Sequence, residues 1–387
     1  ISRTLANRRR VIGMLRFYAG QATAIHGEVI ENSIPGEIVT FTRKEAVGVV
    51  GAIIPWNAPI AASIWKIGPA LATGCTVVLK PSEEAPLTPL LIAKLMQQAG
   101  VPDGVVNVVT GTGAEAGAPL SLHPGVDKIV FTGSTATGQA IARAGTTNLK
   151  RVSLELGGKS PMIICRDADI DRAVPVAAMA VFANSGQICI AGSRLFVARE
   201  IHDEFIRRVA DFALKLRIGN GLEEQTEVGP IISSRQAGKV EGYIDVGKKE
   251  GADLVVGGER LSGPDFDGGN FIAPTVFGAV TDEMTIAREE IFGPVISALP
   301  FDTLDEVVAR ANATPYGLAA GVFTSNVGTA HKLTQRIKAG TVWVNMYHAL
   351  DPAVPFGGIK MSGYGREGGV EHLGEYLETK AVWIQTD

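Results

Sequence analysis

Cysteine is scarce in this chain of 387 residues, which carries only Cys75, Cys165 and Cys189. An odd and small number of cysteines in a chain of this length argues against a disulfide framework and indicates a reducing, cytoplasmic location. The sequence also lacks a CxxC pair and a histidine-rich cluster, so we expect no metal site. Cys75 and Cys165 lie in or beside strand-like patterns, and we interpret both as buried packing residues.

Long apolar runs and blocks of like charge are missing too. The longest apolar stretches, residues 46–56 and 173–183, are well short of the ~20 residues that a membrane-spanning helix needs, so we expect a soluble protein with no membrane partner. The net charge of −4, without a long block of one sign, gives no basis for a nucleic-acid partner. The run Arg8-Arg9-Arg10 is interpreted as a solvated helix face. The chain begins with Ile1 and shows no signal-peptide pattern, so we expect its first residue not to be the start of translation.

The chain is rich in apolar residues, at 46% of its length, which is enough core for two or three domains. After residue 47, short β-branched runs alternate with helical segments, and we expect strands at residues 49–54, 75–79, 105–109, 128–132 and 152–156. Such alternation predicts a doubly wound parallel sheet. A helix is expected before it at residues 8–24, and Thr88-Pro89 is expected to cap the helix that ends at Gln98.

A second α/β set follows, so we expect two such units with a boundary near Gly157-Gly158. Its expected elements are a helix opened by a capping box of Thr303 and Glu306, a helix at 201–216, and strands at 295–299, 318–324 and 341–345. Residues 28–43 alternate around Pro35-Gly36, which predicts a β-hairpin.

The most suggestive cysteine is Cys189, which ends the polar loop Asn184-Ser185-Gly186-Gln187-Ile188-Cys189 after an apolar helical run. A cysteine kept for packing normally lies within an apolar period, whereas a loop can leave the sulfur accessible to a substrate. From this loop alone, a structural and a nucleophilic cysteine remain equally open. Glu155, at the end of an expected strand and before Leu156-Gly157-Gly158, has the position of a base for such a nucleophile.

Two turns are candidates for binding a nucleotide. Gly133 to Gly138 follow an expected strand and open a helix, so backbone amides and the helix dipole there could hold a phosphate, although an ordinary turn is the simpler interpretation when it is taken alone. Lys80-Pro81-Ser82-Glu83 lies at another strand end, where ligands of open α/β sheets bind. Glu83 could accept hydrogen bonds from ribose hydroxyls and repel a 2′-phosphate, which favours NAD over NADP. A surface ion pair of Lys80 and Glu83 is equally open.

Eight ordered segments resemble the aldehyde dehydrogenase superfamily along essentially the whole chain. They are PWNAP (55–59), WKIGPALATG (65–74), LKPSE (79–83), FTGSTATG (131–138), LELGGKSP (154–161), NSGQICIAGSR (184–194), EEIFGPV (289–295) and PFGGIKMSGYGRE (355–367). The resemblance implies an α/β protein with two doubly wound, Rossmann-like units and a small β element. These would be an NAD-binding domain at 1–27 and 44–157, a catalytic domain at 158–358, and a bridging element at 28–43 with 374–385 that makes a homodimer or homotetramer. Relatives are usually longer at the amino end, so we expect the NAD-binding domain to be incomplete there.

The resemblance also assigns three residues to the chemistry, and the chemistry itself suggests a fourth. Cys189 would attack the aldehyde carbon to give a thiohemiacetal, and Asn57 with the backbone N–H of Cys189 would stabilise the oxyanion. Loss of a hydride to the nicotinamide would leave a thioester, and water activated by Glu155 would hydrolyse it. Lys66 is a positive neighbour that would favour the thiolate.

Two binding sets are implied in the same way. Contacts to NAD, with NADP as an open alternative, are expected from Ile53, Trp56, Lys80, Ser82, Glu83, Gly113, Gly133, Ser134, Gly138, Leu156, Glu290 and Phe292. The aldehyde pocket is expected to be lined by Ala58, Ala62, Trp65, Ala183, Ile188, Ile190, Tyr347, Leu350 and Phe356. These side chains predict a roomy, apolar pocket. Neither isoleucine carries a charge and no arginine is obvious at the mouth, which argues against a carboxylate-bearing semialdehyde.

We therefore expect NAD-dependent oxidation of a bulky apolar or aromatic aldehyde to its acid. A CoA-acylating semialdehyde dehydrogenase is one alternative, and the presence of Glu155 argues against it. A more distant alternative is a non-redox thiol esterase or a silent structural protein of the same fold. His348 is the one candidate for the Cys–His dyad of an esterase, although an exposed loop histidine is the simpler interpretation.

Overall fold

The computed structural model describes residues 1–387 apart from the side chain of Arg3. The chain divides into two compact units. The amino-terminal unit comprises Ala6–Glu155, Leu350–Phe356 and Gly365–Asp387, and the central unit comprises Ile1–Leu5, Leu156–Ala349 and Gly357–Tyr364. Within the described part of the chain, no helix combines the length and the apolar character needed to cross a membrane.

A parallel sheet forms the centre of the amino-terminal unit, with its strands in the order β6-β5-β2-β3-β4. Their bounds are β2 (Val49–Ile54), β3 (Thr76–Pro81), β4 (Val106–Val108), β5 (Lys128–Thr132) and β6 (Arg151–Glu155). The strands expected from the β-branched runs are thereby confirmed. Every strand pair among them is parallel, so all five strands end at the same edge of the sheet.

Helices pack with these strands in the amino-terminal unit, and those from α2 to α5 connect them. The helices are α1 (Ser2–Gln21), α2 (Pro59–Ala72), α3 (Leu87–Gln98), α4 (Ala118–Leu122), α5 (Thr135–Gly145) and α12 (Glu371–Gly374), with the π turn η1 (Gly113–Gly117). The chain runs outward from β2 to β4 and then returns to β5 on the other side of β2. Right-handed crossovers therefore place α2 and α3 on one face of the sheet and α5 on the other. Open α/β sheets bind ligands at such a reversal of strand order, which here lies between β2 and β5.

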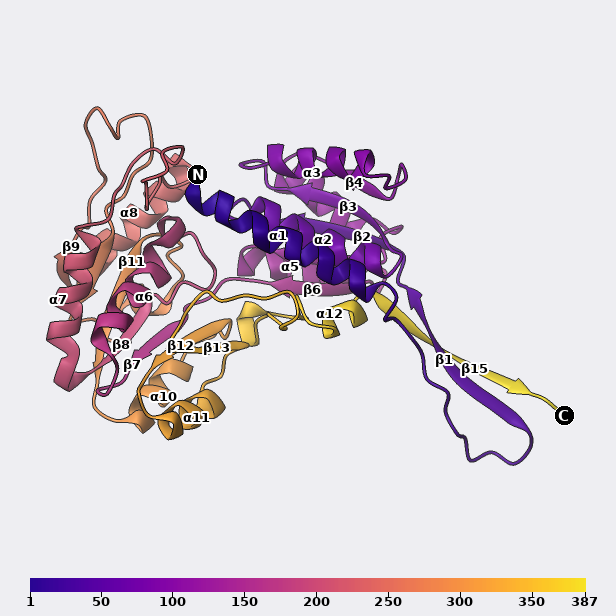
Figure 1. Ribbon diagram of the computed structural model, residues 1–387. Helices are drawn as coiled ribbons and strands as arrows, with labels where there is room; N and C mark the ends of the chain where they lie inside the picture. Colours follow the sequence, from indigo (N-terminus) through magenta and orange to yellow (C-terminus); the bar gives the residue numbers. More distant parts are fainter. The chain divides into compact units, whose positions relative to one another are not determined.

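One local expectation about this unit is wrong and another is met only in part. Thr88-Pro89 does not cap α3, because the helix begins at Leu87 and both residues lie in its first turn, where proline is tolerated. The hairpin expected at residues 28–43 is present only in part. Val29 and Phe41 form an antiparallel bridge, and the backbone N–H groups of Ile30 and Thr42 donate to the carbonyl oxygens of Thr40 and Glu28 at 2.9 and 2.8 Å. The nine residues of β1 (Ile38–Ala46) pair antiparallel with β15 (Leu377–Gln385), as the ribbon of Figure 1 shows. This long partner strand offers more ladder hydrogen bonds than a segment bent at a proline and a glycine.

The central unit has its own sheet, in the order β13-β12-β7-β8-β11-β10-β9, and only β9 runs antiparallel to its neighbour. Its strands are β7 (Pro161–Ile164), β8 (Arg194–Ala198), β9 (Asp253–Val256), β10 (Thr275–Gly278), β11 (Val295–Phe301), β12 (Ala319–Phe323) and β13 (Thr341–Val344). The short strand β14 (Gly363–Tyr364) follows them in the chain. Both sheets are mainly parallel and alternate with helices, which confirms the expected α/β class.

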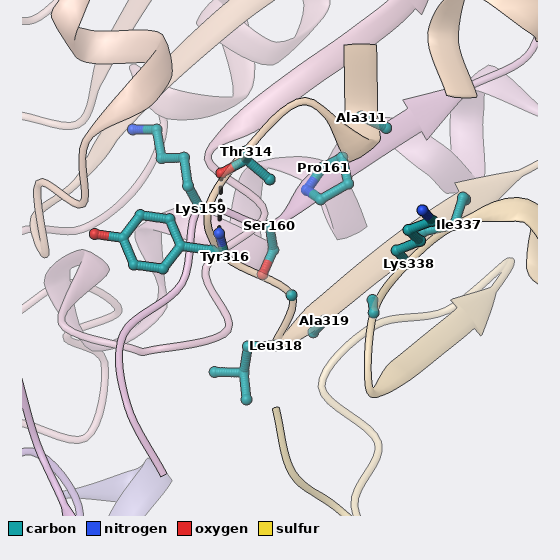
Figure 2. A pocket seen from close by; sticks show the side chains of 12 residues that line it. Lys159, Ser160, Pro161, Ala311, Thr314, Tyr316, Leu318, Ala319, Ile337 and Lys338 are labelled. Atoms are coloured by element: carbon teal, nitrogen blue, oxygen red, sulfur yellow. Dashed lines mark hydrogen bonds between the residues drawn. The ribbon is translucent and has the colours of Figure 1, made fainter. Parts of the chain in front are cut away.

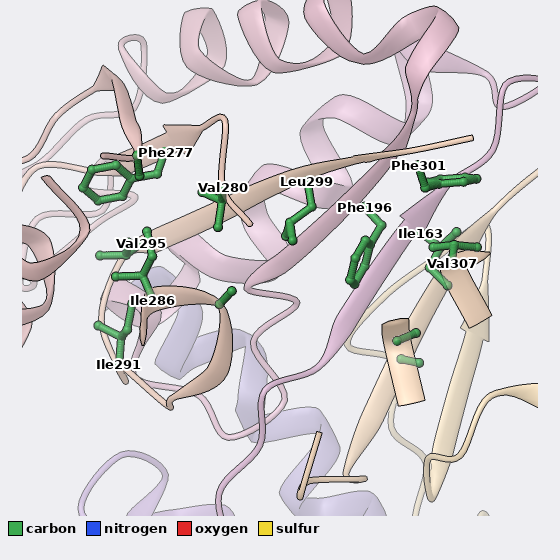
Figure 3. Close-up of a cluster of buried hydrophobic side chains, with 14 of the residues drawn as sticks. Ile163, Phe196, Phe277, Val280, Ile286, Ile291, Val295, Leu299, Phe301 and Val307 are labelled. Atoms are coloured by element: carbon green, nitrogen blue, oxygen red, sulfur yellow. The ribbon is translucent and has the colours of Figure 1, made fainter. Parts of the chain in front are cut away.

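The helices of the central unit are α6 (Ile170–Phe182), α7 (His202–Ala213), α8 (Ser234–Lys249), α9 (Thr285–Arg288), α10 (Leu304–Asn312) and α11 (Val327–Arg336), with the 3-10 turns η2 (Ala183–Gly186), η3 (Arg199–Ile201) and η4 (Lys360–Ser362). The capping box of Thr303 and Glu306 that opens α10 is confirmed. Figure 3 shows the apolar core on one face of this sheet, where Phe196 of β8, Leu299 of β11 and Val307 of α10 are fully buried. This core fixes the strands whose amino ends carry the residues described next.

Candidate active site

The predicted site residues of the amino-terminal unit follow its parallel strands. In strand order they are Asn57 after β2, Ser82 and Glu83 after β3, Gly113 after β4, Gly133 and Ser134 after β5, and Glu155 as the last residue of β6. Because the strands are parallel, all these residues lie at the carboxyl edge of one sheet. Asn57 and Ser134 flank the reversal of strand order, where a ligand is expected.

The turn into α5 is suited to an anion. Ser134 is the N-cap, and its hydroxyl oxygen accepts a hydrogen bond from the backbone N–H of Thr137 at 3.3 Å. The first amides of an α-helix have no acceptor within the helix, and the helix dipole makes this end positive. The turn therefore fits a phosphate group of a dinucleotide. Gly138 is the fourth residue of α5 and is buried.

Lys80 and Glu83 form an ion pair within the same edge, with Nζ 3.2 Å from Oε2. Lys80 is buried, whereas the Glu83 side chain is 51% exposed. The ion pair that was open from the sequence is therefore present, and the exposed carboxylate still has room to accept hydrogen bonds from ribose hydroxyls. Ile53 is buried in β2, and Trp56 is half-buried in the turn after it.

Glu155 is buried beside a recess that charged groups line. The recess is formed by Lys66, Glu155, Glu367, Arg366 and His372 together with Val130, Phe131 and Ser153. The Lys66 ammonium donates a hydrogen bond of 2.7 Å to the hydroxyl of Thr132, which is opposite Glu155 in the β5–β6 register, and forms an ion pair with Glu367. Burial lowers the pKa of His372 well below its usual value, so its ring adds no charge. The positive charge of Lys66, which was predicted to favour the thiolate, is thus balanced by the carboxylate of Glu367.

No local sequence pattern indicates that Glu367 pairs with Lys66. Glu367 is separated from Lys66 by most of the chain, and only the fold brings the two side chains together.

Several predicted pocket residues of the amino-terminal unit are in contact. The rings of Trp65 and Phe356 are stacked, with centroids 6.2 Å apart and an interplanar angle of 20°. Ala62 is buried in the same helix as Trp65, Leu350 is half-buried and Ala58 is exposed. The guanidinium carbon of Arg10 lies 4.7 Å from the centroid of the Trp65 ring.

This position of Arg10 corrects two expectations. The run Arg8-Arg9-Arg10 is not a uniformly solvated face, because Arg10 is half-buried over an aromatic ring while Arg8 and Arg9 are exposed. An arginine also lies beside predicted pocket residues, where none was expected. A signal was available, since Arg10, Met14 and Tyr18 recur at helical spacing and the last two are fully buried.

Cys189 lies in the central unit, between η2 and β8, and its side chain is partly exposed. Cys75 and Cys165 are buried, which confirms their role in packing. Burial raises the pKa of Cys165 to about 12, so that thiol stays protonated. Of the three cysteines, Cys189 alone is accessible to a reactant.

The loop before Cys189 has an unusual backbone. Asn184, Ser185 and Gly186 have φ of 52°, 56° and 71°, a left-handed conformation that costs about 1–2 kcal/mol for each residue with a side chain. Two side chains attach this turn to residues 229–232. The Ser185 hydroxyl donates to the carbonyl oxygen of Gly229 at 2.6 Å, and the amide oxygen of Gln187 accepts from the N–H of Ile232 at 2.9 Å. Such a constrained turn is typical of a functional loop.

Other predicted residues gather at the amino ends of β7, β8 and β11, around Cys189. Gly158 donates its N–H to Oε1 of Glu290 at 3.1 Å, and a Cβ at Gly158 would lie 2.6 Å from the carbonyl oxygen of Cys189. Only glycine allows this approach. Burial raises the pKa of Glu290. Leu156 is buried at the start of the same segment, and Phe292 follows Glu290 with a left-handed φ of 57°.

The remaining pocket candidates of the central unit lie in or beside the Cys189 loop. Ala183 and Ile190 are buried, and Ile188 is half-buried. The Tyr347 hydroxyl donates a hydrogen bond of 2.7 Å to the carbonyl oxygen of Ile190. His348 follows with a left-handed φ of 62° and is half-buried, so it is not an exposed loop histidine.

Another recess lies in the central unit, and no predicted site residue lines it. Figure 2 shows its lining, in which the N–H of Tyr316 donates to the hydroxyl of Thr314 at 3.3 Å. Lys159 is fully buried here, and burial lowers its pKa to about 7. Among the described residues no group accepts a hydrogen bond from its ammonium nitrogen.

Comparisons with known proteins agree with this geometry. A profile of the Aldehyde dehydrogenase family matches residues 1–382. The chain is 52% identical to the human mitochondrial aldehyde dehydrogenase over 376 residues, covering 97% of this chain and 72% of that protein. It is likewise 52% identical to cytosolic aldehyde dehydrogenase 1 of Rattus norvegicus, covering 96% of this chain and 73% of that protein.

A solved structure gives the same result in three dimensions. The NAD⁺ complex of an aldehyde dehydrogenase from Bacillus cereus superposes with a TM-score of 0.95 at 49% identity, covering 98% of this chain and 76% of that one. The sequence profile, the half-identical relatives and the common fold lead to one conclusion: this chain belongs to the aldehyde dehydrogenase family.

Proposed function

We propose that this protein oxidises an aldehyde to its carboxylic acid with NAD⁺, using Cys189 as the nucleophile and Glu155 as the base. The reaction consumes one aldehyde, one NAD⁺ and one water and yields one acid, one NADH and one proton. The observation that carries the proposal is the row of Asn57, Glu83, Ser134 and Glu155 along one carboxyl edge, which would supply an amide donor, phosphate and ribose contacts and a base. Family membership supports the same reaction.

The residues at that edge fit a dinucleotide. The amino end of α5 with Gly133 and Ser134 would hold the pyrophosphate, and Lys80 with Glu83 would hold the adenosine ribose. Glu290 and Phe292 would serve the nicotinamide ribose, and Ile53, Trp56 and Gly113 would complete the site. Bound NAD⁺ supplies the hydride acceptor of the reaction. Glu83 favours NAD over NADP, because its carboxylate would repel a 2′-phosphate.

The chain's own residues carry the remaining steps. The thiolate of Cys189 forms a bond to the aldehyde carbon, and the amide of Asn57 donates to the oxygen that gains the negative charge. Once the carbon has lost its hydride, the acyl group remains on Cys189 as a thioester. Glu155 takes a proton from the attacking water, and the acid leaves as the thiolate is released. Lys66 remains a proposed source of positive charge, now balanced by Glu367.

An aldehyde panel tests this function most broadly. The purified chain is mixed with aromatic and long-chain aldehydes and with NAD⁺ or NADP⁺ in separate reactions, and NAD(P)H formation is measured. We expect NADH and the free acid, with faster turnover on NAD⁺ than on NADP⁺, since the Trp65–Phe356 stack favours an apolar or aromatic body. Absence of turnover with every aldehyde, or turnover that requires CoA, would contradict the proposal.

We also propose a homodimer or homotetramer assembled through β1 and β15. Val39, Trp383 and Ile384 expose between 45% and 56% of their surface on this two-stranded ribbon. Exposed apolar side chains on edge strands favour pairing with another chain. Light scattering tests this, and a monomer at micromolar concentration would contradict it. A cytoplasmic location stays a prediction from the cysteine count.

A further inference from the structure

Arg10 lies on the buried face of α1. It precedes Met14 and Tyr18 by one and two helical turns, and both of those side chains belong to the apolar core that also contains Ala62 and Trp65 of α2. Arg8 and Arg9, on the neighbouring positions, are exposed. The helix therefore turns one of three adjacent arginines toward the residues proposed to line the aldehyde pocket.

The Arg10 guanidinium stacks on an aromatic ring but is not neutralised. Its carbon is 4.7 Å from the Trp65 centroid, within the range of a cation–π contact. Among the described side chains, no carboxylate comes within ion-pair distance of it, and burial alone lowers its pKa. A guanidinium stays charged in proteins, so this site holds a partly buried positive charge without a counter-ion.

An uncompensated positive charge beside the proposed aldehyde pocket favours a ligand of opposite charge. Burial of a charge is unfavourable unless a partner of opposite sign is present, and the planar guanidinium matches a carboxylate with two parallel hydrogen bonds. The stacked rings of Trp65 and Phe356 beside it match a flat, apolar body. Arg10 and the two rings together therefore suit a molecule that is apolar along its length and anionic at one end.

Asn57 and Trp65 set the approximate length of that molecule. Asn57 precedes α2 and Trp65 lies in its second turn, so their backbones are separated by roughly 10 Å along the helix axis. A substrate whose aldehyde meets Asn57 and whose anion meets Arg10 needs a ring or a chain of several carbons between the two groups.

We propose that the natural substrate is an aldehyde that carries a carboxylate at its far end, a formyl-benzoate or a long ω-oxo acid, and that Arg10 binds this carboxylate. The inference rests on the proposed function and names its substrate class. It replaces the expectation from the sequence that a carboxylate-bearing aldehyde is disfavoured. The reaction at the aldehyde carbon is unchanged.

Matched pairs of aldehydes test the proposal. 4-Formylbenzoate is compared with benzaldehyde, and 6-oxohexanoate with hexanal, by measuring kcat/KM with saturating NAD⁺. We expect the full chain to prefer the carboxylated member of each pair by at least about tenfold, and Arg10→Met to lower kcat/KM for that member by about 10–100-fold, as for a lost charge-assisted hydrogen bond. The loss for benzaldehyde and hexanal should be at least about fivefold smaller than that for their carboxylated counterparts, because only the latter carry an anion for Arg10 to bind. Arg10→Lys should recover part of the loss, because it keeps the charge without the planar fork.

Arg9→Met is the matched control, since it removes the same charge from an exposed neighbouring position. It should leave every kcat/KM within about twofold. A preference for the uncharged aldehydes, or equal losses in Arg9→Met and Arg10→Met, would overturn the proposal.

Binding without turnover separates this proposal from the proposed function. Terephthalate, which carries two carboxylates on one ring, is titrated into the same three proteins by calorimetry. Arg10→Met should weaken its binding at least about tenfold, whereas Arg9→Met should not. If no aldehyde is oxidised and terephthalate still binds through Arg10, the proposed function fails and the anion site stands. If aldehydes are oxidised and terephthalate binding is independent of Arg10, the anion site fails and the function stands.

Discussion

The hydroxyl of Tyr347 donates a hydrogen bond of 2.7 Å to the carbonyl oxygen of Ile190, the residue after Cys189. On the other side of the thiol, Gln187 accepts from the N–H of Ile232 at 2.9 Å. The backbone that carries Cys189 is therefore held from both sides by side chains of its own unit. A nucleophile reacts fastest when its position is fixed before the substrate arrives.

Tyr347→Phe should lower kcat by about 10–100-fold and leave the affinity for NAD⁺ unchanged, because misplacement of a reacting group by about 1 Å can cost 10²-fold in rate. Ser297→Ala is the matched control. It also removes a hydroxyl that donates to a backbone carbonyl, that of Ile286 at 2.8 Å, but away from the Cys189 loop. Steady-state kinetics and a thermal melt of both variants check this. Equal kcat values in the two variants would mean that the Tyr347 hydroxyl only stabilises the fold.

Glu155→Gln should separate the two halves of the reaction. The amide cannot take a proton from water, so the thioester should accumulate while its formation continues. We expect a burst of NADH close to one equivalent per active site, followed by a steady rate lower by about 10²–10⁴-fold. Rapid mixing with detection of NADH measures both phases. A variant without a burst and with a normal steady rate would remove Glu155 from the role of base.

Glu367→Gln should destabilise the protein, because it leaves the buried Lys66 ammonium without its carboxylate. The side chains of this pair are 2% and 11% exposed, and loss of one member of a buried pair typically costs about 3–5 kcal/mol. The free energy of unfolding in urea measures the effect. Glu45→Gln is the control, since its pair with Lys380 is exposed and should contribute little. Equal unfolding midpoints for Glu367→Gln and the unmodified chain would contradict the account of this recess.

The buried Lys159 should make stability depend on pH. Its pKa is lowered to about 7 by burial, whereas the lysines of the unfolded chain keep their usual value near 10.4. Between these values the unfolded state holds a proton that the folded state has released, so the free energy of unfolding should rise with pH. The rise from pH 7 to 9 should reach up to about 2 kcal/mol, at no more than about 1.4 kcal/mol per pH unit.

Lys159→Met provides the comparison for this rise. The variant keeps the length of the side chain and removes the titrating group, so its stability should change less between pH 7 and 9. Lys128, whose burial lowers its pKa to about 8, contributes in the same direction to both proteins and cancels in the difference. Parallel pH dependence in the variant and the unmodified chain would show that Lys159 does not release its proton on folding.

Local pattern predicted much of the fold. The strand Val49–Ile54 was expected at its observed bounds, and the capping box at Thr303 was identified from two residues three apart. Such features depend on neighbours in sequence. The pairing of β1 with β15 could not be derived from alternation, because the partner strand lies at the other end of the chain and competes with a nearer segment.

Some residues of the candidate site were likewise predictable from local pattern, and others were not. Strand ends and glycine turns identified Glu83, Ser134 and Glu155, since parallel strands necessarily bring their ends to one edge. The partner of Lys66 could not be found, because Glu367 meets it only through the tertiary fold. The inward position of Arg10 could have been predicted from the sequence, because Arg10 has helical spacing to the buried Met14 and Tyr18. The two neighbouring arginines made the run look like a uniformly solvated face instead.

In the proposed reaction, the accessible thiol of Cys189 carries the acyl group. The most direct measurement is the rate of aldehyde-dependent NADH formation by Cys189→Ala, with Cys165→Ala as the control for loss of a buried thiol. We predict that Cys189→Ala forms no NADH and that Cys165→Ala retains the rate of the unmodified chain. NADH formation by Cys189→Ala at an undiminished rate would contradict the account.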